Sequence, residues 1–576
     1  MSIRSALVWS SVLVAAIATR THDRDFPGCP AGCRTTPSDA AWPQTSDWAQ
    51  LNATVGGKLI QSVPLAAPCH KTLNGRPSGL YDEARCAALR DVWFFPETHL
   101  ADPASPMSYQ FTHNSCNPWS GPDAPCTTGT DAVYVIKATE VSDIQAGIRF
   151  AAEKNIRLVI RNTGHDYLGK STGAHSLSIW IHSLKSMELL DHYSSSEYTG
   201  PAIKLGAGVE PLEAYKFADS HGLNVVGGNC PTVAMGGGFI QGGGHGPLAS
   251  RHGLAADQVL EMEVVSPSGE PLKASATENT NLFWALRGGG GGTFGVVTSV
   301  TVKAFPDTIG STASMTVPNT GDNADALYSA IGGWIQKALP GLVDAGAFVS
   351  WIAAPFGFMV SPAVAPGLTS AELDALMQPM LDILKAAGLN YTYSSAQHPT
   401  FLASYQFYQQ TASWNVSDYN LGGRLLPRDL DTDALVGAIR HISTTALLSG
   451  VSYNVAAGVR SPDDVAVQPY MRKTLIGVAL GTPLNYTDWS ASVAGQEQIT
   501  HDLVPALERL TPNGGAYLNE ADFQQPDFQR TLYGDHYQRL LEIKRKYDPE
   551  SIMYAKTAVG SEEWEERGDG RLCRVK

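Results

Sequence analysis

Glycine clusters between residues 164 and 292 constrain the fold of this chain more than any other feature of its sequence. They occupy the segments 227–238, 242–246 and 288–292, and short β-type runs such as 260–265 separate them. Flexible Gly-Ser linkers lack such interleaved strand patterns. Glycine lets the backbone approach a bulky ligand because it has no Cβ atom. The clusters therefore predict loops that line a large planar ligand and its phosphate groups.

A strand, a helix and a second strand precede the first of these glycine turns. We predict a strand over 132–136, a helix over 141–154 and a strand over 156–160, which together indicate a parallel crossover unit. The second strand leads into the turn 161–169, where backbone N–H groups can surround a pyrophosphate. No cluster has the G-x-G-x-x-G context of a Rossmann fold or the lysine of a Walker loop. Ordinary dinucleotide-binding and P-loop folds are therefore disfavoured.

The remainder of the chain indicates more than one lobe, because 576 residues are too many for one ordinary hydrophobic core. Residues 27–126 are rich in proline and glycine and predict a wrapping arm with little regular structure. From about 308 to 510, amphipathic helices alternate with strands, which predicts an α+β lobe with an antiparallel sheet. Further helices are expected over 84–92, 211–221, 371–387, 432–449 and 535–547.

The N-terminus predicts export of the protein. Arg4 precedes an apolar stretch over 6–18 that ends in the small-residue pattern of Ala16 and Ala18 and is too short to span a bilayer. We therefore expect a signal peptide over 1–18 and a secreted product. Four N-x-Ser/Thr sequons support this expectation. Their asparagines are Asn52, Asn390, Asn415 and Asn485.

Charge excludes two classes of partner. The formal net charge is −14, and the longest basic run is 544–546. Nucleic acids and anionic membranes both require clustered cations, so neither is an expected partner.

The cysteines predict disulfides in the arm. Six of the eight lie between 29 and 126, where Pro- and Gly-rich loops gain most from covalent links in an oxidising compartment. The simplest pairs are Cys69 with Cys86 and Cys116 with Cys126, although sequence cannot fix the connectivity. Cys230 stands apart from the others. No metal site is expected.

Four motifs occur in a characteristic order. The turn Arg161-Asn162-Thr163-Gly164-His165-Asp166 is followed by Cys230-Pro231-Thr232-Val233, by Gly242-Gly243-Gly244-His245-Gly246, and by the segment Tyr517-Leu518-Asn519. Together they resemble the berberine-bridge-enzyme-like branch of the vanillyl alcohol oxidase flavoprotein superfamily. The resemblance extends from about residue 128 to the C-terminus.

The resemblance implies a two-lobed α+β fold of the vanillyl alcohol oxidase or PCMH type. It implies an FAD-binding domain over 128–307, a substrate lobe over 308–510 and a C-terminal segment over 511–576 that returns to the FAD domain. The disulfide-linked arm over 19–127, expected from composition, precedes them. FAD is then held by two covalent bonds, from His165 to the 8α-methyl group and from Cys230 to C6. The other expected cofactor-binding residues are Arg161, Asn162, Gly164, Asp166, Gly236, Gly237, Gly243, His245 and Asn519. His245 has two interpretations, a contact to the ribityl chain or flavin edge and a purely structural role.

The catalytic base has more than one candidate in the sequence. Tyr517 and Glu520 are the candidates, and the family carries a Tyr-x-Asn segment that reaches the flavin. This chain has Glu520 where the commoner pattern has a second tyrosine, which puts a tyrosine base in doubt. Val233, three residues after Cys230, is expected beside the path by which oxygen reaches the flavin.

The resemblance implies two functions, and a third from a different class is compared with them. The first is a monomeric oxidase that transfers hydride from a small organic substrate to FAD and electrons on to oxygen, with hydrogen peroxide as by-product. The substrate is an alcohol, a sugar-like hydroxyl or an intermediate of specialised metabolism. The second is a flavin-containing cyclase without net redox turnover, and the third is a binding protein without activity.

Overall fold

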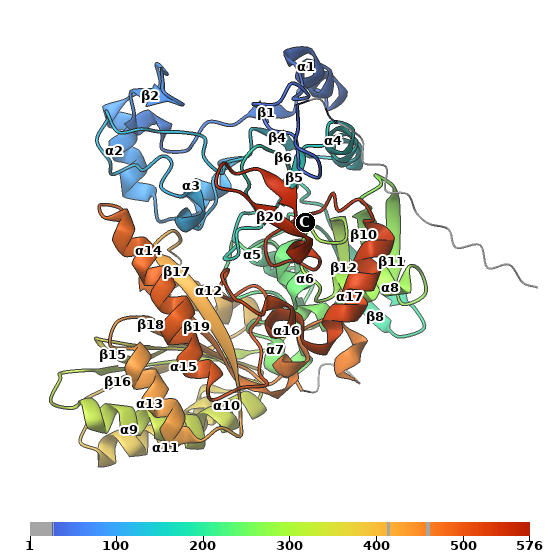
Figure 1. The fold of residues 1–576 in the computed structure, drawn as a ribbon. Helices are drawn as coiled ribbons and strands as arrows, with labels where there is room; N and C mark the ends of the chain where they lie inside the picture. The colour runs from blue at the N-terminus through green and yellow to red at the C-terminus, as the bar shows by residue number, and fades with distance from the viewer. Residues whose placement is uncertain (1–25, 27, 412–414, 457–460, 576) are drawn as a thin grey trace, which may run out of the picture.

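The structure is a computed structural model that describes residues 26, 28–411, 415–456 and 461–575. The predicted signal peptide over 1–18 lies outside these residues. The described chain forms three larger β-sheets and two small two-stranded ones, with helices against the sheet faces (Figure 1). The fold is therefore mixed α+β, as predicted.

The first sheet confirms the predicted crossover unit. Its strand order is β1 (Leu59–Gln61), β4 (Tyr134–Lys137), β6 (Ser176–Trp180) and β5 (Arg157–Arg161). Strands β4 and β5 both pair with β6 in parallel, and helix α4 (Val141–Glu153) connects them. The helix ends before Asn155, whose φ of 52° is a left-handed conformation that asparagine tolerates. Strand β5 leads directly into the predicted nucleotide turn.

The second sheet is antiparallel and carries the glycine loops. Its order is β11 (Pro271–Ser275), β10 (Val259–Val265), β12 (Val296–Pro306), β8 (Thr199–Gly206) and β7 (Met187–Ser194), and β9 (Leu223–Val225) also pairs with β12. The helices of this region are α5 (Pro211–Asp219), α6 (Ile240–Gly242), α7 (Ala249–His252) and α8 (Thr280–Leu286). The C-terminal helix α17 (Tyr537–Tyr547) packs Leu540 and Leu541 into the same hydrophobic core. The end of the chain thus returns to this sheet.

The third sheet has seven antiparallel strands. Its order is β16 (Thr392–His398), β13 (Gly310–Pro318), β15 (Gly357–Pro366), β14 (Phe348–Ala354), β18 (Leu447–Ser452), β19 (Thr474–Pro483) and β17 (Tyr419–Pro427). The helices of this region, seen beside the sheet in Figure 1, are α9 (Ala324–Gly333), α10 (Leu339–Asp344), α11 (Ser370–Ala386), α13 (Thr432–Ile442) and α15 (Val504–Glu508). Their side chains share one buried core with the sheet. Helix α12 (Phe401–Thr411) packs instead near β13, β15 and α5, between this sheet and the second sheet.

One predicted helix is too long. We expected a helix over 432–449, but α13 ends at Ile442 and β18 begins at Leu447. Strand β18 lies between β14 and β19 and pairs with both, so ladder hydrogen bonds and burial of Leu448 outweigh the local helical pattern. The predicted domain boundaries at 127, 307 and 510 stay predictions.

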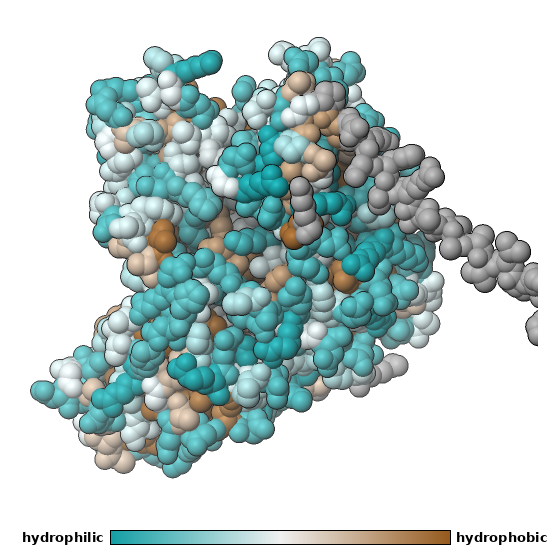
Figure 2. Space-filling view, in the orientation of Figure 1, coloured by the Kyte–Doolittle hydropathy of each residue, from teal (hydrophilic) through white to brown (hydrophobic). Residues whose placement is uncertain are grey.

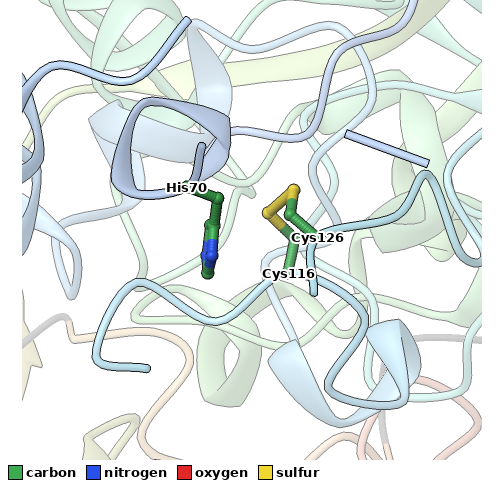
Figure 3. A group of neighbouring side chains, drawn as sticks. All are labelled: His70, Cys116 and Cys126. Carbon is green, nitrogen blue, oxygen red and sulfur yellow. A yellow bond between two sulfur atoms is a disulfide. The ribbon is translucent and has the colours of Figure 1, made fainter. Parts of the chain in front are cut away.

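The N-terminal arm contains more regular structure than its composition predicts. Besides β1, its elements are α1 (Thr45–Thr54), β2 (Thr72–Leu73), β3 (Arg76–Pro77), α2 (Glu83–Val92) and α3 (Pro96–Leu100). The expected disulfides Cys69–Cys86 and Cys116–Cys126 are both present. His70 lies beside the second one (Figure 3), and its ring nitrogens face the carbonyl oxygens of Asn117 and Ala124. Because both sulfurs are in a disulfide, this group is not a metal site.

A third disulfide, which the sequence did not predict, joins the two ends of the described chain. Cys33 bonds Cys573, next to the small sheet of β20 (Trp564–Glu566) and β21 (Leu572–Arg574), and Figure 1 shows the C-terminus beside β20. Arg571 reinforces the junction with charge-assisted hydrogen bonds to Asp39 at 2.6 and 2.9 Å. The arm and the C-terminus therefore form one structural unit. The remaining helices are α14 (Trp489–Gln498) and α16 (Phe528–Tyr533).

Removing this disulfide tests how much the junction stabilises the protein. Replacing Cys33 and Cys573 together by serine is expected to lower the stability by about 2–4 kcal/mol, because the unfolded chain regains the freedom of a very long loop. Thermal unfolding measures the loss. Cys29→Ser is the control, since Cys29 is a free cysteine in the same region. Equal unfolding midpoints for the double variant and the control would contradict the expected role.

Figure 2 shows a mostly hydrophilic face with small, scattered apolar patches. Among the described residues, no helix has both the length and the apolar composition needed to cross a bilayer.

Candidate active site

A cavity of about 370 Å³ lies where the predicted motifs meet. Its main walls are the turn after β5, the loops and helical turns between β9 and His245, the segment around the start of β12, and the stretch between α15 and α16. Ile181 and residues 415–416 complete the lining. The lining includes Asn162, Gly164, His165, Asp166, Cys230, Val233, Gly237, His245, Asn519, Tyr517 and Glu520. Residues separated by more than 350 positions in the sequence, such as His165 and Tyr517, thus share one site.

The turn after β5 is shaped by its own side chains. A Cβ atom on Gly164, whose φ is +93°, would lie 3.0 Å from the Arg161 guanidinium. The Asp166 carboxylate accepts hydrogen bonds from the backbone N–H groups of Leu168 and Ser171, at 3.0 and 2.6 Å. Asp166 therefore fixes the turn, and burial raises the pKa of its carboxyl group.

Three predicted cofactor-binding residues do not line the cavity. Arg161 is buried, and its guanidinium donates to the carbonyl oxygens of His99 and Asp102, so it attaches the turn to the N-terminal arm. A Cβ atom on Gly236 would lie 2.7 Å from the Cα of Ala207, so this glycine permits close backbone packing. Gly243, with φ of +131°, shapes the loop before His245. These three motif residues therefore support the backbone of the cavity wall but do not face the cavity themselves.

His165 and Cys230 lie side by side in the cavity. The His165 Nε2 and Cys230 Sγ atoms are 4.0 Å apart. Loss of hydration lowers the pKa of His165 to about 4, so its ring is neutral at neutral pH, and burial raises the pKa of the Cys230 thiol. Helix α12 fixes the loop that carries Cys230, because Tyr405 and Gln409 both donate to the carbonyl oxygen of Asn229, at 3.1 and 2.8 Å.

The cavity walls fit a flat ligand with hydrogen-bonding edges. A Cβ atom on Gly291 would lie 3.0 Å from the Cα of Gly238, so two backbone segments approach each other closely here. The side-chain oxygens of Asn162 and Gln241 are buried and have no hydrogen-bond partner within the described residues. Buried polar atoms are rarely left unpaired, so these two acceptors fit the donors of a ligand. The lining therefore suits a flavin nucleotide.

Sequence reasoning missed a cation in this site. Lys170 directly follows the predicted pyrophosphate turn over 161–169 and lines the cavity. Burial lowers its pKa to about 8, which a neighbouring anion would reverse. Lys170 is the only basic side chain in 162–171 apart from His165, and this composition was the signal that could have identified it.

The candidate bases form a second cluster. The Tyr517 hydroxyl accepts hydrogen bonds from Gly244 N and Asn519 Nδ2, at 3.1 and 2.8 Å. Burial, and secondly the charge of Glu520, raise the pKa of Tyr517, so its hydroxyl keeps its proton. Asn519 also donates to the carbonyl oxygen of Gly238, at 2.9 Å, and so connects this stretch to the glycine loop.

His245 is paired with Glu520. Its Nε2 atom lies 2.9 Å from Glu520 Oε1. The ring stacks on Tyr453, with centroids 5.2 Å apart and an interplanar angle of 18°, and its Nδ1 has no partner within the described part of the chain. The His245 side chain is 5% exposed and that of Glu520 is 23% exposed. The pair thus joins a buried imidazole to a carboxylate that opens toward the cavity.

The four sequons differ in their surroundings. Asn390, Asn415 and Asn485 are exposed, whereas Asn52 is half-buried in α1. Asn415 also lines the cavity, and the hydroxyl of its sequon serine, Ser417, donates to the carbonyl oxygen of Met107. Glycosylation at all four stays a prediction.

Comparison with known proteins identifies the family. A family model described as an FAD binding domain matches residues 132–275, and another described as berberine and berberine like matches residues 516–560. The chain is 41% identical over 553 residues to the FAD-linked oxidoreductase sor8 of Hypocrea jecorina, which covers 95% of this chain and 94% of that protein. The chain belongs to the berberine-bridge-enzyme-like FAD-linked oxidoreductases.

Two further relatives extend the comparison. The oxidoreductase is 40% identical over 590 residues to the bifunctional decalin synthase calF of Penicillium decumbens, with full coverage of both chains. The VAO-type flavoprotein MtVAO615 of Myceliophthora thermophila C1 has the same fold, with a TM-score of 0.88 and 37% identity over 94% of this chain and 100% of that one. The predicted family, fold and enzyme class are thus confirmed.

The two family models fall on the two parts of the site. The FAD-binding match contains the turn after β5 and the Cys230 loop. The berberine-like match contains Tyr517 to Glu520 and helix α17. The cavity of this oxidoreductase is therefore assembled from both matched regions.

Proposed function

We propose that this oxidoreductase is a secreted oxidase that holds FAD through two covalent bonds, from His165 and Cys230. The observation that carries the proposal is the 4.0 Å separation of His165 Nε2 and Cys230 Sγ in the wall of one cavity. Asn162, Gln241 and Lys170 lie around the same space and would bind polar parts of the cofactor.

The three disulfides support secretion, because disulfides form and persist in oxidising compartments. N-terminal sequencing of exported protein, with a start near Thr19, tests secretion.

The same cavity supplies a base for substrate oxidation. When bound, FAD accepts a hydride equivalent from the substrate carbon. We assign proton removal to Glu520, because its carboxylate opens toward the cavity and His245 orients it. Tyr517 retains its own proton and positions the loop at Gly244. A small alcohol, a sugar-like hydroxyl or an intermediate of specialised metabolism fits this chemistry.

A screen of such substrates tests the proposal. Under anaerobic conditions a true substrate bleaches the flavin absorbance, and admission of oxygen restores it with release of hydrogen peroxide. A substrate that is converted without bleaching or peroxide favours the alternative, a cyclase without net redox turnover. The relative named as a decalin synthase is the observation in favour of that alternative.

Val233 provides a separate test of oxygen as the electron acceptor. Its side chain lines the cavity three residues after Cys230 and packs against the core of the second sheet. Val233→Ile adds one methylene group, which a close-packed wall cannot absorb freely. We expect reoxidation by oxygen to slow about tenfold or more, because such overpacking typically costs 1–3 kcal/mol, while reduction by substrate changes little.

Stopped-flow absorbance measures the two half-reactions of the Val233 variant separately. Val233→Ala is the control with added space, and its reoxidation should be at least as fast as that of the native protein. Equal slowing of both half-reactions in Val233→Ile would remove Val233 from the oxygen path.

A further inference from the structure

Thr232 lies between the two proposed flavin-linking residues. Its Oγ1 atom is 2.7 Å from His165 Nε2 and 3.6 Å from Cys230 Sγ. The residue is buried, with 6% of its surface exposed. Thr232 therefore contacts both residues, and its hydroxyl can form hydrogen bonds to both at once.

The chemistry of the three groups limits how their hydrogens are shared. A neutral imidazole carries one N–H, and a threonine hydroxyl donates one hydrogen bond and accepts others. The short contact places the Thr232 hydroxyl at Nε2. The hydrogen bonds found for the His165 ring within the described residues all involve Nε2 and none involves Nδ1. A proton on Nε2 is therefore hydrogen-bonded to Thr232, whereas a proton on Nδ1 would have no acceptor among the described residues.

We propose that Thr232 is a positioning residue that holds His165 in the tautomer with its proton on Nε2, so that Nδ1 keeps the lone pair that forms the bond to FAD. This inference rests on the covalent attachment proposed above. In this arrangement Nε2–H donates to Thr232 Oγ1, and the Thr232 hydroxyl donates to Cys230 Sγ.

The overall stoichiometry of attachment agrees with this role. The new N–C bond replaces one N–H and one C–H bond, so two protons and two electrons leave, and an external two-electron acceptor such as dioxygen takes the electrons. One of the protons departs from Nε2, the atom at which Thr232 lies. Thr232 also lines a surface groove together with His182 and Glu210, whose side chains are 2.7 Å apart. The groove gives that proton an exit toward a carboxylate and solvent.

The inference can be tested in a variant that keeps only one of the two flavin-linking residues. In a Cys230→Ala background only His165 can hold flavin covalently, so Thr232→Val and Thr232→Ser are compared there. Mass spectrometry of the peptide that contains His165 measures the linked fraction. Thr172→Val is the matched control, because Thr172 is also 6% exposed and its hydroxyl also makes one 2.7 Å hydrogen bond, to Thr130 O.

We expect Thr232→Val to lower the linked fraction or its rate of formation about tenfold, in line with the loss of one good hydrogen bond. Thr232→Ser and Thr172→Val should stay near the parent value. The attached nitrogen is a second readout that general loss of packing would not change: the parent and the serine variant should be linked through Nδ1, and the valine variant should show an Nε2-linked product.

Each result has a defined meaning. Full linkage through Nδ1 in Thr232→Val would overturn the role of Thr232 while leaving covalent attachment intact. An equal loss in Thr232→Val and Thr172→Val would also overturn it, because packing alone would then explain the effect. Native protein that releases all its flavin on denaturation would overturn covalent attachment and this inference together.

Discussion

Replacing both His165 and Cys230 by alanine is expected to release all of the flavin when the protein is denatured, whereas the native protein stays yellow after acid precipitation. Each single alanine variant should retain covalent flavin, because the other side chain lies on the same cavity wall and forms its bond independently. Flavin fluorescence of the denatured protein after gel electrophoresis and the intact mass both measure the linked fraction.

The free cysteine elsewhere in the chain is the control for this experiment. Cys29 is unpaired and lies near Arg571 at the junction of the two ends, so Cys29→Ala should keep the full linked fraction. A His165→Ala variant that loses all covalent flavin would show that Cys230 does not bond the cofactor on its own. The bicovalent assignment would then be wrong.

Replacing Glu520 by glutamine is expected to slow flavin reduction by substrate about 10²–10⁴-fold, the range typical for loss of a general base. The change keeps the size of the side chain and one hydrogen bond to His245, but it removes the negative charge that accepts the proton. Anaerobic stopped-flow absorbance measures the reduction rate with a substrate found by bleaching.

Tyr517→Phe distinguishes the two candidate bases. It removes a hydroxyl that keeps its proton and accepts hydrogen bonds from Gly244 N and Asn519 Nδ2, so we expect a loss of about tenfold or less. If Tyr517→Phe instead loses activity by several orders of magnitude and Glu520→Gln does not, Tyr517 is the base. The covalent flavin content of both variants should equal that of the native protein.

Local sequence patterns predicted elements best where the local and tertiary preferences agree. The unit over 132–160 alternates strand, helix and strand patterns, and its strands are found within two residues of the predicted ends. The helix predicted over 432–449 is wrong in its C-terminal half. There the residues occupy a central position in a sheet, which imposes a strand in spite of their helical periodicity. The prediction for the arm was wrong in the opposite direction. Helix α1 forms in a stretch that we expected to be irregular because of the surrounding prolines and glycines.

Single residues of the site likewise divide into those whose position the sequence predicted and those whose position it did not. Motif order placed His165, Cys230 and Asn519 in one cavity, where the structure has them. The same motifs included Arg161, whose side chain turns away toward the carbonyl oxygens of the arm. Spacing along the chain fixes which backbone segments reach the site, but not the direction of each side chain.

The sequence by itself determined the family and the cofactor class, because these depend on residue types within short motifs that occur in a characteristic order. It offered the two local disulfides as the simplest pairs without fixing them. Only the tertiary structure decided the pairing of His245 with Glu520, the position of Thr232 between His165 and Cys230, and the Cys33–Cys573 bond across 540 residues. The two pairs span 275 and 540 positions, and the Thr232 contacts depend on which way three side chains point. Such contacts follow from how the sheets and loops pack in three dimensions, which residue spacing along the chain does not encode.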